Sequence, residues 1–481
     1  MKKKYFHLLV PVFISIMIGP LKAQQNVGIG TTTPNASAQL DVSSTNKGAL
    51  IPRMTTTQRK AISAPAAGLL VFDMDKKTIY MFDGSKWHPF LFSTNETKLP
   101  PYPMEASDGV NNDYFGFSVS ISGDYAIVGA PYDSENAVFQ GSAYIFFRNG
   151  GVWTQQAKLF SPNYSIDDHF GYSVGISGDY AVVGAPDENV GPSAQGRAYV
   201  FHRSGSTWTA QGSFTSSDGG PGDRFGYSVV ISGDYVIVGA PNFGAEDKGG
   251  AYIFYREFTW IFGQGFTAKL AASDGLASDQ FGWSVCIDGD YAIIGTPYDD
   301  GTAIDQGSVY IYYRGAGWLT TGLPHQAKLV ADAASDRFGY SVSINGDYVI
   351  VGASNDDNST ITDQGSAYIY FRTGVTWNFQ TKLVAFDGSA NDVFGRSVCI
   401  KGEYAIIGAV GDDVGLNSDQ GSCYLYKRTG TTWSLVRKID DDNGKSSGLF
   451  GYSVSVSGYN LLIGAYQKNN FKGEINFLNI E

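Results

Sequence analysis

One repeat restricts what this chain can fold into more than any other feature. Seven times a Phe-Gly pair opens a predicted strand, and these successive pairs lie 55 to 57 residues apart. Each pair is followed by a second motif, Gly-Ala-Pro or a variant that keeps the glycine. The pairs begin at Phe115, Phe170, Phe225, Phe281, Phe338, Phe394 and Phe450, and the second motif begins at Gly129, Gly184, Gly239, Gly295, Gly352, Gly408 and Gly464. A fixed period of this length indicates one supersecondary unit copied in tandem.

Each repeat contains four strand signals. In the first copy these are FSVSI, YAIVGA, SAYIFFR and VWTQQAKLF. The first three are apolar throughout, which is typical of strands covered on both faces, whereas the fourth alternates apolar and polar residues. An x-Gly pair such as Ser122-Gly123 separates the first two strands and predicts a two-residue hairpin turn. Four-stranded antiparallel sheets repeated radially predict an all-β fold, a seven-bladed β-propeller.

The ends of the repeat region predict how the ring closes. The seventh repeat shows only three strand signals before Glu481. Ahead of the first repeat, Glu96-Thr97-Lys98-Leu99 resembles Gln156-Ala157-Lys158-Leu159 of the fourth strand. We therefore expect an N-terminal strand to complete the last blade, which leaves no open face between blades.

The remaining sequence predicts two further regions. Residues 1–23 begin with three consecutive lysines after Met1, followed by a short apolar stretch and a small-residue cleavage site, which predict a signal peptide. We therefore expect the mature protein to be secreted, periplasmic or on the outer cell surface, with no transmembrane segment. We expect residues 24–92 to form a head or spacer with a β-hairpin between Leu69 and Trp87, and residues 93–481 to form the propeller.

The charge of the chain limits its partners. The formal net charge is −12 at pH 7. An acidic surface repels nucleic acid and favours cations or basic partners. Nucleic acid is therefore not an expected ligand.

Thr97 to Glu481 resembles the FG-GAP repeats of the integrin α-subunit propeller, and more closely the repeats of secreted bacterial FG-GAP proteins. The resemblance rests on the two motifs that recur in phase, and it implies a ring that carries ligand on the loops of its upper face. Integrin-type repeats hold calcium in a long acidic loop, DxDxDGxxD, between the first two strands. Here that loop is only Ser122-Gly123-Asp124, which is too short to supply six to eight oxygen ligands. We expect no calcium there, and we expect turn-stabilising roles for Asp124 and its equivalents Asp179, Asp234, Asp290, Asp347 and Glu403.

Acidic residues concentrate instead in the loops after Gly-Ala-Pro and in the loops before Phe-Gly, which emerge on the same face of a propeller. We predict that this face is strongly negative. In one interpretation the acids shape turns, with the Asp two residues before each Phe accepting main-chain N–H groups. In the other, the face binds cations such as calcium, or a basic partner. The candidate metal ligands are Asp299, Asp300, Asp305, Asp356, Asp357, Asp363, Asp412, Asp413 and Asp419.

No catalytic constellation is recognisable, and we expect a protein that is not an enzyme. Gly171 to Gly175 matches the GxSxG pattern of serine hydrolases, but it belongs to the repeated FGYSV strand and lacks the strand-to-helix turn of a nucleophile elbow. Repeated Arg and Trp residues, such as Arg148 and Trp153, are expected to stack across the hairpin between the third and fourth strands. An alternative role for the tryptophans is a carbohydrate-binding aromatic ring.

The stretch NVGIGTTTPNASAQLDV resembles head segments of secreted and tail-fibre-like bacterial proteins, which implies attachment or oligomerisation through the head. Together these features predict a secreted or cell-surface, non-enzymatic binding or adhesion protein. Its upper-face loops would present a surface to a protein, glycan or cation ligand. Two alternatives stay open: a propeller enzyme acting on polysaccharide with acids at the axial mouth, and a purely structural spacer.

Overall fold

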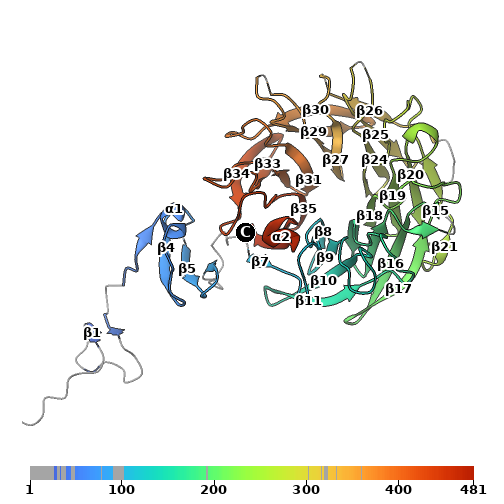
Figure 1. Ribbon diagram of the computed structural model, residues 1–481. Coiled ribbons are helices and arrows are strands. Elements are labelled where there is room, and N and C mark those ends of the chain that lie inside the picture. Colours follow the sequence, from blue (N-terminus) through green and yellow to red (C-terminus); the bar gives the residue numbers. More distant parts are fainter. Residues whose placement is uncertain are drawn as a thin grey trace, which may run out of the picture. The chain divides into compact units, whose positions relative to one another are not determined.

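A computed structural model of the chain describes residues 27–29, 33, 40–44, 49–76, 78–89, 102–190, 193–301, 303–315, 317–318, 323–331, 333–358 and 360–480 (Figure 1). The predicted signal peptide and the segment from Glu96 to Leu99 lie outside these residues. The chain divides into two compact units, Met1–Phe82 and Asp83–Glu481. Among the described residues, no helix has the length and hydropathy needed to cross a membrane.

The N-terminal region contains a small sheet with the strand order β3-β4-β5-β6. Its strands are β3 (Arg53–Met54), β4 (Leu70–Asp73), β5 (Thr78–Phe82) and β6 (Trp87–Pro89), and β1 (Val27–Ile29) pairs separately with β2 (Leu40–Val42). Strands β4 and β5 are antiparallel, which confirms the predicted hairpin. Helix α1 (Thr56–Lys60) begins with a capping box between Thr55 and Gln58. Buried Arg59 donates to Asp73 at 2.9 Å and lies 3.8 Å from the centre of the Tyr80 ring.

The second unit is the predicted propeller, and its seven sheets are antiparallel and four-stranded, with one added strand in blade two. Blade one contains β8 (Ser118–Ser122), β9 (Tyr125–Ala130), β10 (Ser142–Asn149) and β11 (Val152–Leu159), and blade two contains β12 (Ser173–Ser177), β13 (Tyr180–Ala185), β16 (Arg197–Ser204) and β17 (Thr207–Phe214). Blade three contains β18 (Ser228–Ser232), β19 (Tyr235–Ala240), β20 (Gly250–Tyr255) and β22 (Ala268–Leu270), and blade four contains β23 (Ser284–Asp288), β24 (Tyr291–Thr296), β25 (Ser308–Tyr313) and β26 (Ala327–Val330). Blade five contains β27 (Phe338–Asn345), β28 (Tyr348–Ala353), β29 (Ser366–Thr373) and β30 (Thr376–Leu383), blade six contains β31 (Phe394–Lys401), β32 (Tyr404–Ala409), β33 (Ser422–Thr429) and β34 (Thr432–Asp440), and blade seven contains β35 (Ser453–Ser457), β36 (Asn460–Ala465), β37 (Glu474–Asn479) and β7 (Tyr102–Met104). Shorter elements are β14 (Asn189–Val190), β15 (Ser193–Ala194), η1 (Ala245–Asp247), α2 (Lys468–Phe471) and β21 (Phe262–Gln264), which adds to the edge of blade two. Figure 1 shows first strands such as β8, β27 and β35 around the axis and fourth strands such as β11 and β34 on the outside.

The Phe-Gly motif holds neighbouring blades together. Each motif Phe is almost fully buried between two blades. The Ser two residues after each motif Gly donates to the carbonyl oxygen of the next motif Gly, as Ser118 does to Gly171 at 2.9 Å. The other six bonds join Ser173 to Gly226, Ser228 to Gly282, Ser284 to Gly339, Ser341 to Gly395, Ser397 to Gly451 and Ser453 to Gly116. The seven bonds form a closed circle around the axis.

The glycine of the second motif allows this close contact. A Cβ atom on Gly129 would lie 1.9 Å from the carbonyl oxygen of Gly171 in the next blade. The corresponding distance at Gly184 is 2.0 Å. A side chain at these positions would push adjacent blades apart, which explains why this glycine is kept in all seven copies while the proline is not.

An N-terminal strand completes blade seven, as the sequence predicts, but it is not the predicted segment. Strand β7 pairs antiparallel with β37, and Met104 lies opposite Ile475, as Leu159 lies opposite Ala143 in blade one. The closing strand therefore lies five residues beyond the one expected from the sequence. Its apolar residue precedes Asp108 by four positions, the same spacing that separates Leu383 from an acid in blade five.

One arrangement repeats along the lower rim, which consists of the turns between the first and second strands and the hairpins between the third and fourth strands. It differs in part from two predictions. Asp124 pairs with the guanidinium of Arg148 at 2.6 Å and does not bond to its own turn. The equivalent pairs are Asp179 with Arg203, Asp234 with Arg256, Asp290 with Arg314 and Asp347 with Arg372. The nearest ring to these arginines generally belongs to the preceding blade: Arg203 lies 4.3 Å from the Tyr125 ring centre, whereas Arg148 lies 5.6 Å from Trp153. The guanidinium therefore joins neighbouring blades, while in blades one, five and six it also contacts the tryptophan across its own hairpin, as predicted.

Candidate functional site: the upper face of the propeller

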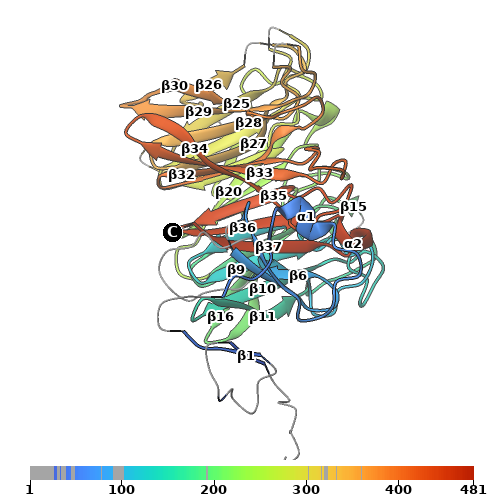
Figure 2. The same cartoon turned by 90° about the vertical axis from the view of Figure 1, so that its left-hand side faces the viewer.

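The upper face consists of the loops between the second and third strands of each blade, here called 2–3 loops, and the interblade loops before each Phe-Gly pair. Gly141 at the end of one 2–3 loop forms a bridge with Phe170 after the next interblade loop, and equivalent bridges occur at Gly196, Gly249, Gly307, Gly365 and Gly473. Figure 2 shows β15 and α2, which both lie in 2–3 loops, on one face of the ring and the C-terminus on the other. The prediction that both loop sets share one face is confirmed.

Before blades one, two, three, four and six, the Asp two residues ahead of the motif Phe shapes the interblade loop, as the first interpretation proposed. Asp113 accepts the main-chain N–H of Val110 at 2.6 Å, and Asp392 accepts that of Ser389 at 2.6 Å. Asp168, Asp223 and Asp279 accept equivalent N–H groups. Burial raises the pKa of Asp113 and of Asp392 to about 6. These buried carboxylates therefore stabilise the interblade loops.

Lysines on the fourth strands compensate part of the negative charge that the sequence predicts for this face. Lys158 contacts Asp108 at 2.7 Å, Asp133 at 2.7 Å and Glu135 at 2.6 Å. Equivalent lysines pair with acids in four other blades: Lys269 with Asp218, Lys328 with Asp274 and Asp299, Lys382 with Asp356, and Lys438 with Asp387 and Asp412. The signal was present in the sequence as a lysine at the same place in these repeats.

The nine candidate metal ligands form three sets of three equivalent residues. Buried Asp299, Asp356 and Asp412 pair with the strand-four lysines and accept hydrogen bonds from Ser308, Ser366 and Ser422. Asp300, Asp357 and Asp413 accept the main-chain N–H groups of Asp305, Asp363 and Asp419 at 2.8–2.9 Å. Within the described part of the chain, no group of three or more His, Cys, Asp or Glu side chains is arranged to hold a metal ion. Calcium binding on this face stays a prediction, without a coordination cluster to support it.

A repeated glutamine, which the sequence analysis did not single out, ties the two loop sets together. Gln195 donates to the carbonyl oxygen of Ser216 at 2.6 Å, and Gln420 donates to that of Asp441 at 2.9 Å. Both glutamines are buried and immediately precede the glycine that opens the third strand. The 2–3 loop of one blade is thereby fixed to the interblade loop that follows.

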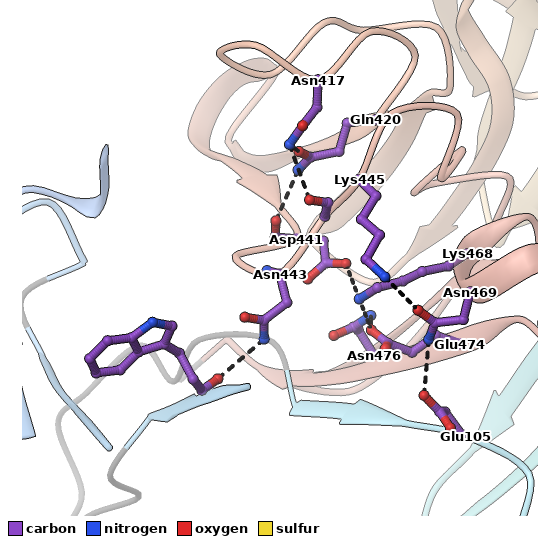
Figure 3. Close-up of polar contacts among 12 residues, drawn as sticks. Glu105, Asn417, Gln420, Asp441, Asn443, Lys445, Lys468, Asn469, Glu474 and Asn476 are labelled. Atoms are coloured by element: carbon purple, nitrogen blue, oxygen red, sulfur yellow. Dashed lines mark hydrogen bonds and ion pairs between the residues drawn. The ribbon is translucent and has the colours of Figure 1, made fainter. Parts of the chain in front are cut away.

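Blade seven reverses the charges of the lysine–aspartate pairs that the other blades form between the fourth strand and the 2–3 loop (Figure 3). Lys468 stands where Asp412 stands in blade six. It is 4% exposed, pairs with Asp441 and contacts Glu474 at 2.6 Å. Lys472 pairs with Glu105 at 2.8 Å. Both lysines therefore have carboxylate partners, although blade seven lacks the acidic pattern of the other 2–3 loops.

An aromatic pocket of about 280 Å³ occupies the upper end of the axis. Its wall is formed by the residue that follows each Phe-Gly pair: Phe117, Tyr172, Tyr227, Trp283, Tyr340, Arg396 and Tyr452. Arg396 lies 4.5 Å from the ring centre of Tyr340 and 4.3 Å from that of Tyr452. The described lining contains no Asp or Glu. The sequence analysis missed this site, although the position was visible as the variable residue between Gly and Ser.

Several exposed apolar side chains project from the loops of the upper face. Leu416 in the 2–3 loop of blade six is fully exposed, Ile304 in that of blade four is 72% exposed, and Phe386 before blade six is 69% exposed. These loops therefore offer apolar surface that a ligand on the upper face could bury.

The fold and this face define a seven-bladed propeller with ligand-accessible upper loops, and the comparisons identify its family. The sequence matches the FG-GAP repeat family over residues 103–146, 153–201, 208–254, 265–312, 324–370, 377–426 and 433–476. The chain therefore belongs to the FG-GAP repeat family. Residues 28–99 match a second family, described as a phage tail like trimerisation region.

The other comparisons identify no further family. No curated protein matches the chain. Among solved structures, a chain from "Crystal Structure of Mitotic Checkpoint Complex" is similar with a TM-score of 0.48 and 11% identity, covering 81% of this chain and 98% of that one.

Proposed function

We propose that this protein is an exported, non-enzymatic binding or adhesion protein that holds a protein or glycan ligand on the upper face of its propeller. The observation that carries the proposal is the aromatic pocket at the upper end of the axis, whose described lining offers stacking surfaces and a cation but no carboxylate for acid–base chemistry. The exposed apolar side chains of the upper loops would become buried when a ligand binds.

The N-terminal region supports a multivalent form of the same function. Residues 28–99 match a trimerisation family, and the leader predicted for residues 1–23 supports export. Three propellers on one stem would bind a repetitive surface far more tightly than one propeller, because the second and third contacts are intramolecular. Sedimentation equilibrium of the mature full chain is expected to give the mass of three copies.

Array binding tests the proposal. The full chain is applied to glycan and matrix-protein arrays, with and without calcium. A variant with Ile304→Ser, Phe386→Ser and Leu416→Ser removes the apolar side chains of the upper loops, and we expect it to bind at least tenfold more weakly. The matched control carries Phe258→Ser, Val375→Ser and Tyr459→Ser, which change exposed side chains in 3–4 hairpins and a 1–2 turn on the lower side.

The outcomes separate the candidate functions. Equal loss in both variants, or no binding of the wild-type chain to either array, would contradict the proposal. Binding that requires calcium would restore the cation interpretation of the upper-face acids. Turnover of a polysaccharide by the wild-type chain would favour the enzyme alternative.

A further inference from the structure

Arg396 occupies an unusual place in the aromatic pocket. Six of the seven blades put an aromatic side chain at this position, and blade six alone puts a guanidinium there. Its guanidinium lies beside the rings of Tyr340 and Tyr452, which come from the two neighbouring blades, five and seven.

This guanidinium lacks an anionic partner. Among the described residues it forms no ion pair and no side-chain hydrogen bond, and its close neighbours are the rings of Tyr340 and Tyr452. Ring faces offset only part of the cost of removing a cation from water. An anion that enters the pocket would find five N–H donors in a planar fork, the geometry that binds a carboxylate through two parallel hydrogen bonds.

The residues around the pocket mouth add to the positive charge. Arg224 lies 5.0 Å from the Tyr227 ring centre, and its charge is matched by Asp187 at 3.3 Å. Arg337 lies 5.3 Å from the Tyr298 ring centre and has no carboxylate partner among the described residues. Arg337 therefore adds one positive charge near the axis, although the chain carries a net charge of −12. A local field of this kind attracts anions to the axis.

Shape and chemistry restrict the ligand further. The volume of about 280 Å³ is at the lower end of the roughly 300–1,000 Å³ of small-molecule sites, so it suits one or two sugar units. Aromatic faces pack against the C–H surfaces of a pyranose ring, and the guanidinium binds a carboxylate on that ring. We infer that the axial pocket binds a carboxylate-bearing sugar unit of an acidic glycan. This inference rests on the proposed binding function and names its ligand class.

Calorimetric titration of the full chain tests the inference. The probes are trigalacturonate and sialyllactose, with lactose as the neutral sugar and sodium sulfate as the anion alone. The decisive variant is Arg396→Tyr, which gives blade six the residue that blades two, three, five and seven already carry and so preserves the aromatic ring. We expect it to bind both acidic sugars at least tenfold more weakly, while lactose binds wild type and variant equally weakly.

Two further variants control for charge. Lys427→Gln removes one exposed positive charge far from the axis on β33 and is expected to leave acidic-sugar binding unchanged. Arg337→Gln removes a charge at the mouth and is expected to weaken binding about threefold, less than Arg396→Tyr. Raising the salt concentration should weaken acidic-sugar binding and leave the lactose signal unaffected.

Three results would overturn the inference. They are undiminished binding of acidic sugars by Arg396→Tyr, lactose binding as tight as that of sialyllactose, and complete displacement of the sugars by an equal concentration of sulfate. If the wild-type chain still binds an array through its upper loops in any of these cases, the proposed function stands and only the ligand assignment fails. If the wild-type chain binds neither arrays nor acidic sugars, both fail.

Discussion

Blades six and seven solve one electrostatic problem with opposite charges. In blade six, Asp412 lies at the start of the 2–3 loop, and the cation comes from Lys438 on the fourth strand at 2.6 Å. In blade seven the loop residue is Lys468, and the anion comes from Glu474 at the start of the third strand. What the repeats maintain at this position is a paired charge, and the sign of each partner can be exchanged.

The closing strand explains why blade seven differs. In blade six Lys438 lies opposite Tyr424, and in blade seven Pro103 lies opposite Asn476. Because β7 has a proline where the fourth strands of blades one, three, four, five and six have a lysine, no cation can reach the loop from that strand. The loop therefore supplies its own cation, and Asp441 from the interblade loop completes the cluster.

The largest expected effect comes from Lys468→Met. This change leaves Glu474 and Asp441 buried without a cation, and breaking a buried pair in this way costs about 3–5 kcal/mol of the free energy of unfolding. Urea unfolding at neutral pH measures the loss. Burial raises the pKa of Glu474, so the defect should shrink as acidic pH protonates the carboxyl. A loss below about 1 kcal/mol at pH 7 would show that the two blades do not share this electrostatic requirement.

Lys438→Met in blade six should cost less. Its Nζ contacts Asp387 and Asp412, but Asp387 is partly exposed and Asp412 retains the hydroxyl of Ser422 as a donor. Loss of a charged hydrogen bond with a remaining partner costs about 1.5–3 kcal/mol. The same urea measurement checks it, and a loss equal to that of Lys468→Met would remove the distinction between the blades.

A still smaller loss of stability is expected for a variant at the lower rim. Arg203→Met removes a pair with Asp179, which is about half exposed, together with the contact to the Tyr125 ring. Exposed pairs contribute about 0.2–1 kcal/mol and a cation–π contact at an exposed site about 0.5–1 kcal/mol, so the total loss should stay near 1 kcal/mol. A shift of the thermal midpoint larger than that of Lys438→Met would contradict this order.

The blade count, strand order and hairpin turns could be predicted because they depend on repeated, local signals. The closing strand was misplaced because QAKL and ETKL share apolar and basic positions, while the structure selects Met104 by its distance from the acid that follows. The roles of the acids depend on which cation reaches them in three dimensions. Lys158 reaches carboxylates on two different loops, and nothing in the spacing of those loops reveals that contact. The axial pocket escaped notice because its wall comes from one position in each of seven repeats, so it exists only once the ring is closed.

The smallest expected effect concerns Asp392, which has no counterpart in blade seven, where Gly448 takes its place. Burial, together with repulsion from Asp412, raises the pKa of Asp392 to about 6 from the model-compound value of 3.8. Between these two pH values the folded state holds more protons than the unfolded state, so this group lowers the free energy of unfolding as pH rises from about 4 to about 6. Asp392→Asn keeps an oxygen that can accept the Ser389 N–H and removes the titration, so its stability should fall less over that window.

The pKa of Asp387, in the same blade, shifts in the opposite direction, so Asp387→Asn serves as the control for Asp392→Asn. Burial acts to raise its pKa, but the contact with Lys438 outweighs burial and lowers it. The stabilisation that Asp387 provides is therefore present above its unfolded pKa and is lost as pH falls through the lower folded value. The difference in thermal midpoint between Asp392→Asn and wild type should therefore change between about pH 4 and pH 6, whereas that between Asp387→Asn and wild type should change only below about pH 4, and with the opposite slope. Parallel curves for the two variants would mean that the buried and the lysine-paired carboxylates of blade six do not differ in the way their surroundings indicate.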